Sequence, residues 1–148
     1  MDMKVAFGCD PNATQLKKVL MDEAKSMGHE VVDFPSADPI YANVAIKVAK
    51  SVAAGEEDRG ILLCGTGIGV SIAANKVEGA YCACVADIYQ AQRATLSNNA
   101  NLLSMGAQVL GPETAKDLLH AYLENNFDPT SRSAPKVARI VEYEEEND

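Results

Sequence analysis

Residues 60–76 read GILLCGTGIGVSIAANK, and this stretch changes character twice along its length. Gly60 to Cys64 is apolar throughout, which is typical of a strand buried on both faces of a parallel sheet. Alternate glycines come next, and the small residues from Val70 to Lys76 then predict a helix. A buried strand that turns through glycines directly into a helix is the repeating unit of an α/β sheet.

The same alternation of strand and helix continues on both sides of this stretch. Strands are expected at residues 4–9, 29–34, 60–64, 80–86 and 101–105 with 109–110, and helices at residues 16–27, 44–52, 70–76, 87–97, 112–125 and 135–145. Residues 144–148 are expected to form a frayed acidic tail. The pattern predicts one domain over residues 1–148, a three-layer α/β/α sandwich whose five-stranded parallel sheet has an extra helix at the C-terminal end.

The composition narrows the class of protein. The chain has 148 residues, of which 47% are hydrophobic and 23% charged, as expected for one compact domain. Its net charge of −8 makes nucleic acid and anionic membranes unexpected partners. A site for a phosphorylated substrate must therefore concentrate hydrogen-bond donors locally, because the overall charge repels anions.

Cys9, Cys64, Cys82 and Cys84 lie in or beside apolar strand-like segments, and none forms a C-x-x-C pair. This pattern favours reduced thiols over disulfides or zinc ligands. Cys82 and Cys84 share one face of a predicted strand and are expected in the core, whereas Cys9 ends another strand and is a possible neighbour of Cys64. The sequence begins without a signal-peptide pattern and has no apolar segment near the ~20 residues that span a bilayer, so a cytoplasmic protein is expected.

The loop Cys64-Gly65-Thr66-Gly67-Ile68-Gly69 has the features of an anion site. Its glycines allow several N–H groups to face one point, and the following helix adds a positive potential there. The spacing matches neither G-x-G-x-x-G nor G-x-x-x-x-G-K, so nucleotide binding loses support. A tight strand-to-helix turn without any ligand remains an alternative.

Cys64 stands directly before these donors, and the same helix dipole favours its thiolate form, which is a base. The alternative is an inert cysteine at the end of a buried strand, which is the commoner case. Parallel strands bring all their carboxyl ends to one edge of the sheet, where ligands bind. Residues 9–11, 64–69, the segment after Asp87 and residues 97–101 are expected to meet at this edge.

Three blocks of sequence resemble the family of ribose-5-phosphate isomerase B and galactose-6-phosphate isomerase. They are ILLCGTGIGVSIAANKVEG at residues 61–79, FGCD at residues 7–10 and SNNANLLSMGAQVLG at residues 97–111. The resemblance implies a Rossmann-like fold and a homodimer or homotetramer with active sites at the subunit interface. It also implies an aldose–ketose isomerase of a small sugar phosphate that works through an enediolate without metal or cofactor.

By the same resemblance, Cys64 matches the catalytic base. Thr66 and the N–H groups of Gly65, Gly67, Ile68 and Gly69 match the region that binds the oxyanion and donates protons. Asp10 and Asn98 match residues that hold sugar hydroxyls, and Arg132 and Lys136 match the phosphate-binding pair.

The chain departs from the family pattern where its members carry histidines and arginines. Pro11 stands where a histidine contacts the phosphate, and Ser97 where a histidine opens the sugar ring. Lys136 replaces an arginine, and Gln108 replaces a basic residue donated across the dimer. The two histidines of the chain, His29 and His120, are expected away from the site.

The missing ring-opening histidine favours an open-chain substrate. A tetrose 4-phosphate cannot close a furanose ring, because its O4 carries the phosphate. Residues 41–43 and 96–100 also resemble the erythrulose-4-phosphate isomerase branch, so erythrulose 4-phosphate is favoured over ribose or ribulose 5-phosphate. Two other hypotheses are a non-catalytic partner subunit of a hetero-oligomeric hexose-6-phosphate isomerase, which the retained Cys64 argues against, and a nucleotide- or flavin-binding module.

Overall fold

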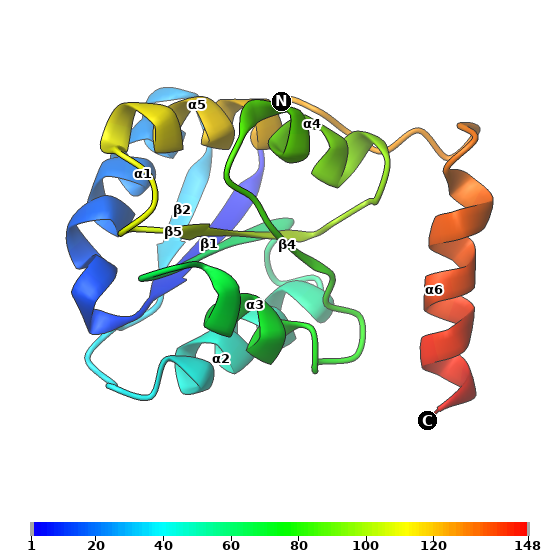
Figure 1. Ribbon diagram of the computed structural model, residues 1–148, viewed down its shortest axis with the longest axis horizontal. Helices are drawn as coiled ribbons and strands as arrows, with labels where there is room; N and C mark the ends of the chain where they lie inside the picture. Colours follow the sequence, from blue (N-terminus) through cyan, green and yellow to red (C-terminus); the bar gives the residue numbers. More distant parts are fainter. Residues whose placement is uncertain (1, 148) are drawn as a thin grey trace.

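The computed structural model describes residues 2–147 and contains a five-stranded, all-parallel sheet in the order β2-β1-β3-β5-β4 (Figure 1). Its strands are β1 (Lys4–Cys9), β2 (Glu30–Asp33), β3 (Arg59–Cys64), β4 (Cys82–Cys84) and β5 (Leu102–Gly106). Its helices are η1 (Pro11–Ala13), α1 (Thr14–Ser26), α2 (Tyr41–Ala53), α3 (Ile68–Ala74), α4 (Ile88–Leu96), α5 (Pro112–Leu123) and α6 (Ala134–Glu146). The predicted α/β fold with an extra C-terminal helix is confirmed.

Helices cover both faces of the sheet, α2 and α3 on one and α1, α4 and α5 on the other (Figure 1). The side chains of β3 alternate between the two layers. Ile61 and Leu63 pack with α1 and α5, whereas Leu62 and Cys64 pack with α2 and α3. Burial on both faces explains the uninterrupted apolar sequence of this strand.

Two strand predictions are wrong in extent. The fifth strand ends at Gly106, because the N–H groups of Val109 and Leu110 both donate to the Gly106 carbonyl and close a turn. The fourth strand has three residues and lies at the edge of the sheet. At this edge Cys82 is only partly covered and Cys84 is exposed, so the expectation that both are core residues is corrected for Cys84.

Helix α6 stands apart from the rest of the chain (Figure 1). None of its residues is buried, and Ile140 and Tyr143 are 52% and 59% exposed. Its Glu144 carboxylate accepts hydrogen bonds from the Gly79 N–H and the Tyr81 hydroxyl. The helix continues through Glu146, so the predicted frayed tail is helical over most of its length, and its last residue, Asp148, lies outside the described residues.

All four cysteines are free thiols, as predicted. Between residues 2 and 147, no helix has the length and apolar character needed to cross a membrane.

Candidate active site

The loop between β3 and α3 is pressed against the end of β5. Gly67 has a left-handed backbone (φ 81°), and a Cβ on it would lie 2.7 Å from the backbone carbon of Met105. A Cβ on Gly106 would lie equally close to Thr66. Hydrogen bonds from the Ala107 N–H to the Cys64 carbonyl (2.8 Å) and from the Ser104 hydroxyl to the Gly67 carbonyl (2.8 Å) fix the loop. Glycine is therefore required where the two segments touch.

Cys64 lies at the base of this loop and is 6% exposed. Its Sγ accepts a hydrogen bond from the Gly67 N–H at 3.1 Å. One amide of the glycine loop is therefore directed at the sulfur. The structure thus places Cys64 beside the glycine loop, on the face of the sheet that α2 and α3 cover.

The loop amides do not all face outward. The Gly67 N–H is directed to Cys64, and the Ile68 N–H donates to Thr66 Oγ1 at 3.2 Å. The Thr66 side chain is exposed and keeps its own hydroxyl hydrogen as a donor. The N–H groups of the first turn of α3 have no acceptor within the helix, and the Gly69 N–H belongs to this turn.

Tyr41, which was not among the predicted site residues, covers Gly69. An ideal Cβ on Gly69 would lie 2.3 Å from the Tyr41 hydroxyl oxygen, and the tyrosine is 39% exposed. Tyr41 begins α2, which packs beside α3. The two residues are 28 positions apart in the sequence, and only the packing of α2 on α3 brings them together.

Asp10 lies at the same edge of the sheet as Cys64. Its N–H donates to the Leu63 carbonyl at 2.9 Å, and its carboxylate accepts the Asn12 N–H at 3.0 Å, capping η1. Cys9, the preceding residue, points to the opposite face of the sheet and donates to Ser36 Oγ at 3.3 Å. Burial raises the pKa of the Cys9 thiol, and its position corrects the expectation that it neighbours Cys64.

Residues 97–101 lie at the amino ends of the strands, whereas Cys64 lies at their carboxyl ends, so the predicted position of residues 97–101 beside Cys64 is wrong. The Asn101 carbonyl accepts the N–H of Gly60, near the start of β3, because the connection from α4 leads into β5 at its amino end. Asn98 is exposed there and lines a cavity of about 350 Å³ together with Val137 of α6. Arg132 and Lys136, at the start of α6, are also exposed.

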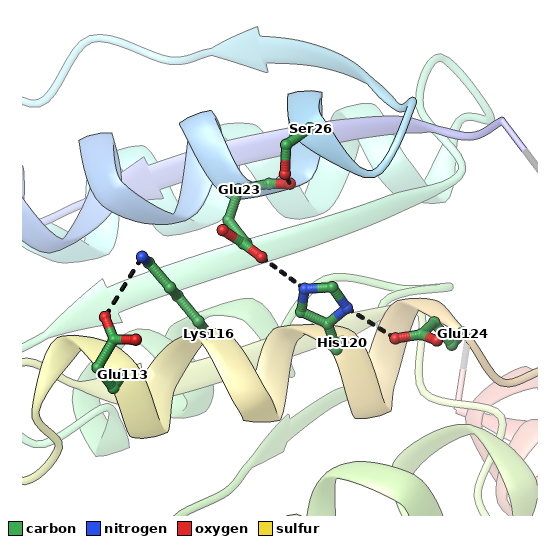
Figure 2. A network of polar contacts seen from close by, with 6 residues as sticks. All are labelled: Glu23, Ser26, Glu113, Lys116, His120 and Glu124. Atoms are coloured by element: carbon green, nitrogen blue, oxygen red, sulfur yellow. Dashed lines mark hydrogen bonds and ion pairs between the residues drawn. The ribbon is translucent and has the colours of Figure 1, made fainter.

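Gln108 lies near the glycine loop, whereas the two histidines lie away from it. Gln108 lies over the loop of its own chain, with Oε1 3.0 Å from an ideal Cβ on Gly65. His29 is buried, accepts the Met3 N–H and has its pKa lowered by burial. His120 on α5 bridges Glu23 and Glu124 (Figure 2). Neither histidine lines the glycine loop, as predicted.

Known proteins resemble this chain over nearly its whole length. D-erythrulose-4-phosphate isomerase of Pectobacterium atrosepticum is 44% identical over 96% of this chain and 95% of its own. Ribose-5-P isomerase B of Listeria innocua is 42% identical over 98% of this chain and 99% of its own. The solved structure of Clostridium thermocellum ribose-5-phosphate isomerase B superposes with a TM-score of 0.92 at 38% identity, covering 99% of this chain and 100% of that one.

A family model described as Ribose/Galactose Isomerase matches residues 5–140, which include the glycine loop, Asp10, Asn98 and the start of α6. The match agrees with the relatives and the solved structure above. The chain belongs to the ribose/galactose isomerase family.

Proposed function

We propose that this protein interconverts an aldose and a ketose phosphate, with Cys64 as the base and a four-carbon substrate, erythrulose 4-phosphate, favoured over ribose or ribulose 5-phosphate. The observation that carries the proposal is the contact of Cys64 Sγ with the Gly67 N–H, at the start of α3. It supports a base that lies beside the backbone N–H groups at the start of a helix. Removal of a proton beside a carbonyl requires such a base and such donors.

In the proposed reaction, the Cys64 thiolate takes a proton from the carbon next to the carbonyl. The electron pair of that C–H bond forms the double bond of an enediolate, and the carbonyl electron pair moves to its oxygen. The thiol then returns the proton to the neighbouring carbon. The N–H groups of the loop that are not directed to Cys64 or Thr66, including that of Gly69, hold the negative oxygen, while Thr66 carries a proton between the two oxygens. Because these donors are fixed before the reaction, they stabilise the transition state at little further cost.

The proposed site requires a second copy of the chain. Cys64 and Asp10 lie at the carboxyl edge of the sheet, whereas Asn98 lies at the amino edge and beside α6, which carries Lys136. The six residues of β3 separate the two edges by about 20 Å, more than a small sugar phosphate spans. We infer a homodimer, or a homotetramer built from dimers, in which Asn98, Arg132 and Lys136 of one copy face the glycine loop of the other.

Exposed apolar side chains support this assembly. Ile68 and Ile72 on α3 are 55% and 59% exposed, and they lie beside the loop on the same helix. Helix α6 presents Ile140 and Tyr143 to solvent, and none of its residues is fully buried against its own chain. Exposed apolar groups of this kind mark contact surfaces when they lie together.

The preference for a tetrose rests on the absence of an acid that opens a sugar ring. The chain has two histidines, and both have partners away from the loop. Ser97 and Pro11, at the two histidine positions of the family pattern, have no group that titrates near neutral pH. An open-chain tetrose phosphate needs no such group.

The test is an isomerisation assay with erythrulose 4-phosphate and ribulose 5-phosphate side by side, using the native chain, Cys64→Ser and Cys64→Ala. We expect the native chain to prefer the tetrose, and the variants to lose roughly 10²–10⁴ in kcat, the usual contribution of a general base. Circular dichroism and gel filtration check that the variants fold and assemble normally.

Preference for the pentose would contradict the substrate, and a loss below about tenfold would contradict the base. A native homo-oligomer that turns over no sugar phosphate would instead favour a non-catalytic subunit.

A further inference from the structure

The last turn of α4 holds an arginine next to Asn98. The Arg93 Nε–H donates to Ser97 Oγ, one turn further along. The Arg93 carbonyl accepts the N–H groups of Ser97 (2.9 Å) and Asn98 (3.2 Å), and Asn99 then ends the turn with a left-handed backbone (φ 51°). Arg93, Ser97 and Asn98 therefore form one hydrogen-bonded unit at the amino edge of the sheet.

Arg93 has no carboxylate partner among residues 2–147, although the chain has 21 acidic residues and 13 lysines and arginines. Arg139 differs, since it pairs with both Glu142 and Glu146. One of the five N–H donors of Arg93 is used by Ser97, which leaves the two terminal nitrogens of a half-buried guanidinium for another acceptor.

An anion bound beside Arg93, at the C-terminal end of α4, would meet the negative end of the helix dipole. A cation in the last turn would offset this repulsion and favour a phosphate here. Asn98 and Val137 line the same cavity, and Val137 directly follows Lys136, so the end of α4 and the start of α6 come together. The basic residues of these two segments are Arg93, Arg132 and Lys136.

We propose that Arg93 binds the phosphate of the substrate as a third cation beside Arg132 and Lys136, with Ser97 fixing the guanidinium. This inference rests on the proposed function. Pro11 and Gln108 stand where the family pattern has a histidine and a basic residue, and Arg93 would supply the positive charge that these two positions lack. A guanidinium stays protonated in proteins, so Arg93 contributes binding and orientation and transfers no proton. It is suited to a phosphate because its terminal nitrogens can donate two parallel hydrogen bonds.

The experiment compares Arg93→Gln with the native chain in KM for erythrulose 4-phosphate and in affinity for inorganic phosphate, measured by calorimetry. We expect KM and the phosphate dissociation constant both to rise about ten- to hundredfold, the range for a hydrogen bond to a charged group, while kcat changes less. Arg93→Lys should recover part of the loss. Arg139→Gln removes an arginine that is already ion-paired and should leave both quantities unchanged. Thermal unfolding separates these effects from loss of structure.

Unchanged KM and phosphate affinity in Arg93→Gln would overturn the inference and leave Arg93 as a helix-capping residue. If the native chain is inactive on every sugar phosphate, the proposed function fails, and phosphate calorimetry alone decides on Arg93. Weaker phosphate binding by Arg93→Gln would then still support the site, and equal binding would refute it.

Discussion

The need for a glycine at position 69 comes from a neighbouring side chain rather than from the backbone angles of the residue. Its φ is not in the left-handed region, yet a Cβ would meet the Tyr41 hydroxyl oxygen at 2.3 Å. The sequence indicated that the glycines of this loop let the backbone approach a ligand. For Gly69 the structure adds a second reason, because the ring of Tyr41 occupies the space above it and limits what can reach the start of α3.

Replacing Gly69 with alanine should displace Tyr41 and lower kcat/KM by up to about a hundredfold, since a misplacement of about 1 Å near the reacting atoms can have this effect. In a Tyr41→Ala chain, the same replacement should cost much less, because the clash is gone. Steady-state kinetics of the two single variants and the double variant measure this coupling. Gly111→Ala is the matched control, since a Cβ there has nothing within 4 Å. Additive losses in the double variant would show that Tyr41 is not what constrains Gly69.

At the scale of elements, α1 and α5 are joined by a histidine between two carboxylates. Figure 2 shows the His120 ring on α5 with one nitrogen toward Glu23 of α1 and the other toward Glu124. The nitrogen–oxygen distances are 2.6 and 2.8 Å. The hydrogen bond to Glu23 raises the pKa of His120, while burial opposes the shift and Glu124 adds to it.

This contact should make stability depend on pH. Because the folded-state pKa of His120 lies above its unfolded value of about 6.5, its stabilising contribution is complete below that value and is lost as pH rises through the folded pKa. Urea unfolding of the native chain and of His120→Gln should therefore differ more at pH 5.5 than at pH 8.5. The side chain is 38% exposed, so the difference should stay below about 1 kcal/mol.

The effect of His29→Gln on stability should have the opposite pH dependence. Burial lowers the pKa of His29, so its contribution is present above about pH 6.5 and is lost as pH falls through the folded value. An equal effect of His120→Gln at both pH values would mean that the two carboxylates do not interact with a charged imidazole.

The strand-to-helix elements could be predicted because their causes are local. The apolar sequence from Gly60 to Cys64 and the glycines after it specify a buried strand and a close turn without reference to the rest of the chain. The short β4 could not be predicted in the same way. Residues 80–86 read as a buried strand, but only an interior place in the sheet would have buried Cys84, and place in a sheet depends on distant pairings.

At the scale of the whole molecule, the predicted site residues are divided between the two ends of the strands, which the sequence did not indicate. Cys64 ends β3, and Thr66 and Asp10 follow β3 and β1, so all three lie at the carboxyl ends of the strands. Asn98 precedes a strand, so the same rule places it at the other edge, beside α6. The isolation of α6 could not be read from its amphipathic pattern, which predicts an apolar face but not the surface that covers it.

This division leads to a prediction about assembly. If each site uses Cys64 of one copy and Arg132 of the other, a mixed dimer of a Cys64→Ser chain and an Arg132→Gln chain contains one intact site and one site with both defects. Such a dimer, co-expressed with two different tags and purified through both, should have about half the native activity at substrate concentrations below the native KM, where each parent has lost most of its activity. Pairing Cys64→Ser with Thr66→Val is the matched control: these residues share one loop, so both sites stay defective. A mixed dimer no more active than its parents would place the phosphate and the base within one chain, which the length of β3 makes physically difficult.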